Sequence, residues 1–129
     1  MKSPILITAF TLLLIFSSTC VAEWTKVSIS VKGTFYVDFD RIKQLGGYVY
    51  FWEMNDFVKP RLGDLSSKMY FQGDCIMFRL KVLSYISYKE SSGQGTSESV
   101  TPPDKWTYPP PDSPLESILK TVCFFAKNR

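Results

Sequence analysis

The sequence of 129 residues contains no histidine. This absence excludes a Ser-His-Asp triad, a Cys-His nucleophile pair and a zinc site built from cysteine and histidine. Glycine-rich phosphate loops and metal-ligand spacings are missing as well. General acid–base chemistry would have to depend on carboxylates, lysine or tyrosine. We therefore expect a protein that is not an enzyme and that needs no metal and no cofactor.

Strong charge of one sign is also missing. The 15 lysines and arginines nearly balance the 12 aspartates and glutamates, so the formal net charge is only +3. Nucleic-acid-binding domains usually carry a pronounced basic surface, and we expect no nucleic-acid partner. Asp38 and Asp40, near an expected strand end, leave a small carboxylate hydrolase as an alternative hypothesis.

Long apolar runs are confined to the N-terminus. One lysine precedes the apolar segment 5–16, and small, weakly polar residues follow it. This order is typical of a secretory signal peptide over residues 1–22, and the apolar segment is short for a membrane span. The mature chain would then be a single domain of residues 23–129. An alternative is a lipoprotein that is cleaved before Cys20 and acylated on it.

Removal of the signal peptide leaves two cysteines, Cys75 and Cys123. An even number of cysteines in an exported protein predicts a disulfide. Closing so long an interval would stabilise the domain by roughly 4 kcal/mol in the chain-entropy model. A structural role is therefore expected for both cysteines.

The periodicity of the mature chain predicts an antiparallel sheet. Segments 24–31 and 34–39 flank the turn Lys32-Gly33 and indicate a hairpin. The aromatic segment 48–54 is apolar on both faces, as expected for a central strand. A further strand is expected at 68–71.

The next strand is expected directly after Cys75. Its inward-facing side chains, by alternation, would be Ile76, Phe78, Leu80 and Val82. Two segments are expected to be loops: 55–65, which contains a proline and a glycine, and 90–99, which is polar and contains glycine.

The C-terminal part of the sequence predicts a strap and a helix. Segment 101–114 holds six of the eight prolines and must be largely extended, with Trp106 and Tyr108 fixed on the core. Ser113 suits an N-cap and Glu116 a capping box. The apolar side of the helix would consist of Leu115, Ile118, Leu119, Val122 and Cys123.

Together these elements predict an α+β fold. We expect a small antiparallel sheet of about five or six strands, with a C-terminal helix packed on it and tied to it by the disulfide.

Binding is the expected activity of such a domain, and loops carry recognition more often than strand interiors do. The expected partner contacts are Ser92, Gln94, Trp106 and Tyr108. The aromatic run of Tyr48, Tyr50 and Trp52 is expected to pack in the core, with a platform for a glycan or a protein as the alternative. A homodimer through an unpaired sheet edge is also left open.

Several motifs resemble the bacterial surface-adhesin E family. Trp24 opens an alternating strand, and the motif FYVDFDRI follows it. The other matching residues are Trp52, Asn55-Asp56-Phe57, Ser67-Lys68, Asp74-Cys75, Arg79, Gly93, Gly95, Trp106 and a P-x-S motif before a helix that ends in Cys123. The resemblance spans residues 24–124.

The resemblance implies an exported bacterial envelope protein, located in the periplasm, at the cell surface or outside the cell. Members of the family bind host extracellular-matrix and serum proteins, and some are lipoproteins. The implied function is therefore a module that recognises a protein ligand, with membrane attachment only if Cys20 is lipidated. The alternative is a soluble periplasmic accessory or structural domain without an adhesive role.

Overall fold

The computed structural model describes residues 23–129. Its elements in chain order are β1 (Thr25–Ser30), β2 (Gly33–Val37), the 3-10 turn η1 (Phe39–Arg41), β3 (Lys43–Leu45), β4 (Tyr48–Arg61), β5 (Asp64–Asp74), β6 (Arg79–Tyr88), the 3-10 turn η2 (Ser91–Gly93), β7 (Ser97–Val100) and the helix α1 (Pro114–Lys127). The expected signal peptide and the expected lipidation at Cys20 lie outside the described residues and stay predictions.

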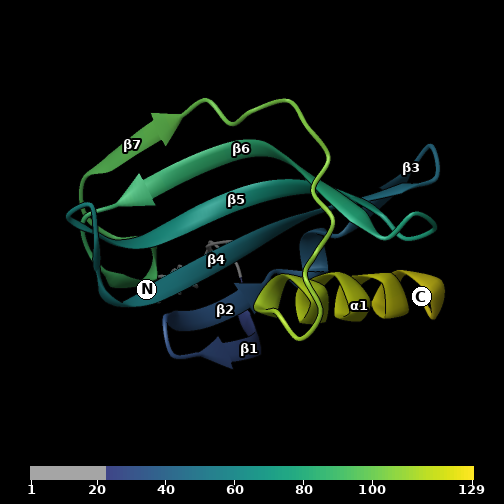
Figure 1. Ribbon diagram of the computed structural model, residues 1–129, viewed down its shortest axis with the longest axis horizontal. Helices are drawn as coiled ribbons and strands as arrows, with labels where there is room; N and C mark the ends of the chain where they lie inside the picture. The colour runs from purple at the N-terminus through teal and green to yellow at the C-terminus, as the bar shows by residue number, and fades with distance from the viewer. Residues whose placement is uncertain (1–22) are drawn as a thin grey trace, which may run out of the picture.

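All strands belong to one antiparallel sheet of seven strands (Figure 1). The main order is β1-β2-β4-β5-β6-β7, and the short β3 pairs with the start of β4. Figure 1 shows α1 alongside the part of the sheet near β3, away from the turn between β4 and β5. The expected α+β fold is confirmed, and so is the first hairpin.

The hairpin of β4 and β5 replaces the loop that was expected at 55–65. Its two strands meet at the turn Leu62-Gly63, where both residues have positive φ angles of 52° and 83°. This is the geometry of a type I′ turn, whose twist matches that of paired strands. Pro60 fits inside β4 because the ladder to β5 is interrupted between Asp56 and Arg61. The expectation was wrong because a proline, which has no backbone N–H, interrupts a strand only where the ladder needs a donor at that position.

Residues 75–78 form a turn, although a strand was expected to begin there. Asp74 shapes this turn, since its Oδ1 accepts hydrogen bonds from the N–H groups of Ile76 (3.1 Å) and Met77 (3.0 Å). Ile76 is therefore 88% exposed and does not point into the core, as alternation had suggested. Leu80 is buried as expected, and Phe78 and Val82 pack against the core.

The polar segment 90–99 contains regular structure that its composition did not predict. It forms η2 and then β7, which pairs with the end of β6. Ser66 holds η2 in place: its hydroxyl donates to the carbonyl of Glu90 (2.6 Å) and accepts from the N–H of Gly93 (2.9 Å). The homodimer through a sheet edge stays a prediction.

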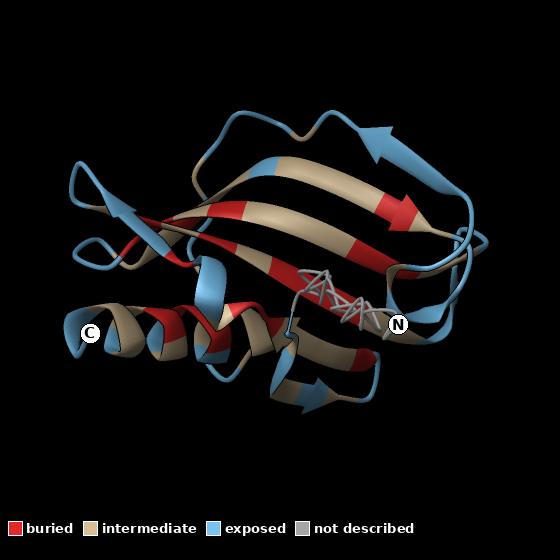
Figure 2. Ribbon diagram, turned by 180° about the vertical axis from the view of Figure 1, so that it is seen from behind, coloured by how far each residue is buried: buried red, intermediate tan, exposed pale blue. Residues whose placement is uncertain are grey.

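The core lies between α1 and one face of the sheet, and the buried stretches of the helix and of the central strands are seen in Figure 2. The helix contributes Ile118, Leu119 and Val122, which are fully buried. The sheet contributes Val37, Ile42, Val49, Phe51, Phe71 and Leu80. Gly73 permits this close approach, because a Cβ atom there would lie 2.8 Å from Val49 Cγ2 and 3.1 Å from Leu119 Cδ1.

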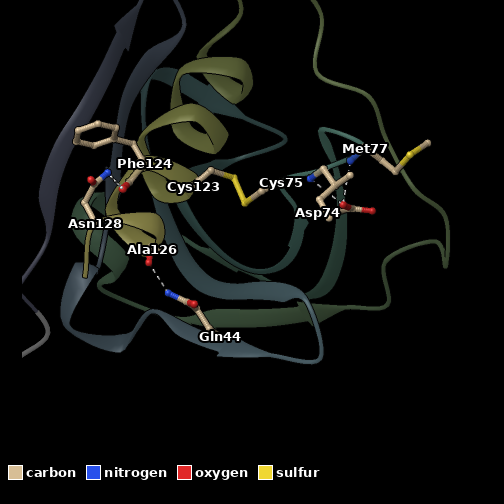
Figure 3. The surroundings of a disulfide bond; sticks show 9 residues. Gln44, Asp74, Cys75, Met77, Cys123, Phe124, Ala126 and Asn128 are labelled. Atoms are coloured by element: carbon tan, nitrogen blue, oxygen red, sulfur yellow. Dashed lines mark hydrogen bonds between the residues drawn. A yellow bond between two sulfur atoms is a disulfide. The ribbon is translucent and has the colours of Figure 1, made fainter.

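A cap and a disulfide fix the two ends of α1. The Oγ of Ser113 accepts a hydrogen bond from the N–H of Glu116 (3.2 Å), so the expected N-cap is confirmed. The return bond of the capping box is displaced by one residue, from the N–H of Asp112 to Glu116 Oε1 (3.4 Å). Near the other end, Cys123 forms the expected disulfide with Cys75, with their Cα atoms 5.8 Å apart (Figure 3).

The proline-rich segment runs from β7 past β6 to the start of α1 (Figure 1). Thr107 exchanges two backbone hydrogen bonds with Leu80 (2.8 and 2.7 Å), so the segment acts as a short edge strand at this point. The extended strap is confirmed, but the expectation that Trp106 and Tyr108 are fixed on the core was wrong. Tyr108 is 59% exposed, and Trp106 packs against Tyr48 and Arg79 outside the core.

The core-facing side of the sheet changes from apolar to polar along β4 and β5. Beyond Phe51 it carries Glu53, Asn55 and Ser67, each at most 9% exposed. Among the described residues, no hydrogen-bond partner reaches Glu53 Oε1, Asn55 Oδ1 or Ser67 Oγ. Burial raises the pKa of Glu53 to about 8, so its carboxyl group is neutral at pH 7.

Candidate binding face

The face of the sheet opposite the core carries a group of aromatic side chains. Side chains alternate along a strand, and Phe51 points into the core, so Tyr50 and Trp52 point to the opposite face. Tyr70 pairs with Trp52 in the β4–β5 ladder. Its ring centroid lies 5.0 Å from that of Trp52 and 6.3 Å from that of Tyr50. This surface, defined by Lys43, Tyr50, Trp52, Tyr70 and Leu83, is termed the aromatic face.

Leu83 lies on the aromatic face, at a β-bulge of β6. Tyr70 pairs with Ser84 and Phe71 with Val82, which leaves Leu83 without an opposite residue. Leu83 points away from the core by the alternation that places Leu80 and Val82 inside, and the extra residue lets Ser84, the partner of Tyr70, face the same way. Leu83 is 41% exposed and lines a hollow together with Tyr50 and Tyr70.

Two adjoining hollows mark this face. The larger, of about 600 Å³, contains Leu45, Tyr50 and Leu83 in its lining, and the smaller, of about 360 Å³, contains Trp52. Lys43 and Tyr70 line both. Burial, and after it the neighbouring Tyr50, raises the pKa of Tyr70, so its hydroxyl stays protonated and able to donate a hydrogen bond.

Cations border the aromatic face. Arg41, Lys43 and Arg129 line the smaller hollow, together with one described acid, Asp40. Arginine, tryptophan and tyrosine are the residues that most often dominate the energy of protein–protein contacts. The composition of the face therefore suits a protein ligand better than an uncharged small molecule.

The strap adds a second aromatic group at the edge of the same face. Arg79 and Lys81 lie over the ring of Trp106, at 4.3 and 4.8 Å from its centroid, and the ring of Tyr48 lies 5.6 Å from it. Arg79 is held by an ion pair with Asp74 (Nε–Oδ2, 3.0 Å). The hydrogen bond from the N–H of Met77, and also that from Arg79, keeps the pKa of Asp74 below its usual range.

The structure places the four expected contact residues at two separate locations. Trp106 and Tyr108 lie at the strap, where Trp106 is half-buried and Tyr108 is 59% exposed. Ser92 and Gln94 are exposed in and after η2, and the N–H of Ser92 donates to Asp56 Oδ1 (2.6 Å). Their role in binding stays a prediction.

The aromatic run was expected in the core, and this expectation was wrong. Val49 and Phe51 belong to the core, whereas Tyr48, Tyr50 and Trp52 are half-buried on the opposite face. Sequence reasoning also missed the contribution of Tyr70, Leu83 and Lys43. The alternation of segment 68–71 could have indicated Tyr70, and the alternation of Leu80 and Val82 could have indicated that Leu83 points outward. The contact of Leu83 with Tyr70 depends on strand register, which has no local signal.

The two aspartates of the hydrolase hypothesis have different surroundings. Asp38 is 1% exposed and its Oδ2 lies 3.3 Å from Nε of Arg41, whereas Asp40 is exposed. Within residues 23–129, no three histidine, cysteine, aspartate or glutamate side chains gather as metal ligands would. No helix in this part of the chain is long and apolar enough to cross a membrane.

Comparison with known proteins gives one family and one fold. The family model described as surface-adhesin protein E matches residues 24–124. No curated protein matches the chain. Among solved structures, one of Haemophilus influenzae protein E is 18% identical, with a TM-score of 0.64 and with 84% of this chain and 89% of that chain covered.

Further structures of protein E agree with this result. Protein E from non-typeable Haemophilus influenzae is 17% identical, with a TM-score of 0.62 and coverage of 83% of this chain and 79% of that one. A second crystal form of the Haemophilus influenzae protein is 16% identical, with a TM-score of 0.58 and coverage of 81% and 96%. At these identities the likeness establishes a shared fold.

Proposed function

Because the chain belongs to the surface-adhesin protein E family, we propose that it is an exported cell-envelope protein that binds a protein ligand through its aromatic face. The family is one of surface adhesins and implies export or display at the cell surface. The mature protein would begin at Glu23 and consist of the single domain described above. The single observation that carries the proposal is the group of half-buried aromatic side chains on the sheet face opposite the core.

The open face of this sheet has an unusual composition. A face that is not packed on a core is usually covered by polar side chains. Here the corresponding positions of β4 and β5 hold Tyr50, Trp52 and Tyr70, and β6 adds Leu83. These side chains keep apolar area accessible to a partner, and the cations beside them can pair with acidic groups on its surface.

The test is binding of the folded protein to a panel of matrix and serum proteins, with affinity measured by surface plasmon resonance. Leu83→Asp places a charge in the larger hollow and should weaken binding about tenfold or more. Val58→Asp is the matched control, because Val58 is also an exposed apolar residue of a strand, 66% exposed in β4. It should bind like the unchanged protein.

Two outcomes would contradict the proposal. One is the absence of saturable binding to every member of the panel. The other is an equal loss in Leu83→Asp and Val58→Asp, since this would show that the aromatic face has no special role. We also expect binding to disappear when the Cys75–Cys123 disulfide is reduced, because the helix and β5 are tied by it.

A further inference from the structure

The end of the molecule that carries the disulfide presents apolar side chains to solvent from three separate segments. They are the β3–β4 turn, the β5–β6 turn and the last turns of α1, which lie at the same end of the fold in Figure 1. The exposed residues are Leu45 (72%), Ile76 (88%), Met77 (54%) and Phe124 (71%). This surface is termed the disulfide end. Exposed apolar groups gathered from several elements usually mark an interaction surface.

These side chains are held in place by the fold. Asp74 accepts hydrogen bonds from the N–H groups of Ile76 and Met77, and Cys75 is bonded to Cys123 of α1 (Figure 3). A hollow of about 630 Å³ lies between the β3–β4 turn and α1, with Leu45, Phe124 and the disulfide in its lining. The hydrogen bonds and the disulfide therefore fix the apolar residues around this hollow. Folding alone does not require these residues to be exposed.

The exposed charge at the disulfide end is mainly positive, since its acid, Asp74, is 6% exposed and pairs with Arg79 (3.0 Å). Segments 43–49, 75–79 and 123–129 contain Lys43, Arg79, Lys127 and Arg129 and no aspartate or glutamate. The opposite end is mixed, since segment 57–64 contains Lys59, Arg61 and Asp64, and Asp64 pairs with Lys89 (3.0 Å). A partner that fits the disulfide end must accept apolar side chains and offer negative charge.

We propose that the disulfide end docks on the surface of an anionic lipid bilayer. A protein partner would need hydrogen-bonding groups spread over the contact, but the turn 75–78 has no polar side chain. The amide of Gln44 already donates to the carbonyl of Ala126 (2.7 Å). A bilayer surface needs apolar side chains at the level of the headgroups and cations around them. This surface offers both.

Docking in this way gives the domain an orientation. The turn between β4 and β5 lies at the other end of the molecule (Figure 1), so it would point away from the bilayer. The aromatic face would stand beside the bilayer and stay open to a ligand. The disulfide end adjoins the proposed protein-binding site, because Lys43 and Leu45 belong to both, whereas Ile76 and Met77 lie outside the hollows of the aromatic face. Docking does not depend on acylation of Cys20.

The test is sedimentation of the full chain, produced in an exporting host, with vesicles of phosphatidylcholine alone or with phosphatidylglycerol added. A Cys20→Ser background removes any contribution from an acyl chain. We expect partition to anionic vesicles only, weakened by salt. Ile76→Ser with Met77→Ser should reduce the partition coefficient about tenfold. Val31→Ser with Leu62→Ser is the matched control, because these residues are 92% and 96% exposed at the opposite end.

Each other outcome decides against the proposal. Lack of binding to anionic vesicles would overturn it, and so would equal losses in the two double variants. Size-exclusion chromatography with light scattering gives a second readout. A dimer that dissociates on changing Ile76 and Met77 would show that a second copy of the chain covers this end. Because Ile76 and Met77 are largely exposed, unchanged thermal unfolding of the variant is expected and keeps the result interpretable.

Discussion

The two halves of the core-facing side of the sheet are built on the same strands but with opposite chemistry. Near the disulfide, β4 contributes Val49 and Phe51, and α1 packs on them. Farther along the same strand, the corresponding positions hold Glu53 and Asn55, which are buried and have oxygens that no hydrogen-bond partner within residues 23–129 reaches. Burial of apolar area stabilises a fold, whereas burial of an unpaired polar group costs free energy.

The comparison teaches where this small domain obtains its stability. The disulfide half has the apolar core and the covalent link, while the half near the β4–β5 turn carries a neutral carboxyl group in its interior. The disulfide half therefore offsets the free-energy cost of burying polar groups in the half near the β4–β5 turn. Substitutions in each half test this contrast.

Removal of the disulfide should have the largest effect. Changing Cys75 and Cys123 together to alanine should lower the free energy of unfolding by about 4 kcal/mol, because the unfolded chain regains the freedom of a long loop. Urea denaturation followed by circular dichroism measures the loss. Reduction of the unchanged protein should shift the midpoint by a similar amount. An unaltered midpoint in the double variant would contradict the structural role of the disulfide.

Two glycine substitutions compare the tightness of packing in the two halves. Gly73→Ala places a methyl group against the side chains of Val49 and Leu119, which can shift, and should cost about 1–3 kcal/mol. Gly33→Ala should cost more, because its Cβ would meet the backbone carbonyl of Asp56. Thermal unfolding of both variants measures the order. A smaller loss of stability in Gly33→Ala than in Gly73→Ala would show that the backbone around Gly33 can shift to accommodate the methyl group.

Glu53 should make stability depend on pH. Below pH 4.5 the carboxyl is protonated in the folded and the unfolded chain. Between pH 4.5 and about 8 only the unfolded chain loses the proton, since burial raises the folded pKa to about 8. Between pH 6 and pH 7 the free energy of unfolding should therefore fall by about 1.4 kcal/mol, and the fall should end above about pH 8.

Glu53→Gln should remove this contribution, and urea denaturation at several pH values measures it. Glu98→Gln is the control, because Glu98 is exposed in β7 and should leave the slope unchanged. If the stability of the unchanged protein is level between pH 5 and 8, Glu53 is not the buried neutral acid described here.

The smallest expected effect is a gain at the β4–β5 turn. Leu62 occupies the first central position of the type I′ turn with φ of 52°, a conformation that asparagine adopts more readily than leucine. Leu62→Asn should raise the free energy of unfolding by about 1 kcal/mol, since Leu62 is 96% exposed and gives up no packing. Leu62→Ala, measured in the same thermal scan, should bring no such gain.

Much of the fold could be predicted from local sequence patterns. Ser113 and Glu116 mark the start of α1, and the alternation after Trp24 indicates the first hairpin, because caps and strand periodicity depend on residues close together in the chain. The two cysteines of the described chain indicate the disulfide by their number. In each case the signal and the structure that it specifies involve the same few residues or a single pair.

The candidate site could be predicted less well from the sequence. Tyr50 and Trp52 were recognised as a binding platform only as an alternative to core packing, because an aromatic run does not reveal which face of a strand the core will cover. Leu83 was not recognised, although alternation after Leu80 and Val82 points it outward, because its place beside Tyr70 depends on the pairing of β5 with β6. The exposure of Ile76 depends on two hydrogen bonds to Asp74, which override the alternation.

Local chemistry was thus sufficient for the class of fold, the capped helix and the covalent link between helix and sheet. Which side of β4 faces α1, where the bulge falls and which apolar residues stay at the surface were settled by strand pairing and helix docking. The physical reason is that register and packing depend on contacts between segments far apart in the chain. The aromatic face and the disulfide end both consist of such segments, so both surfaces exist only in the folded molecule.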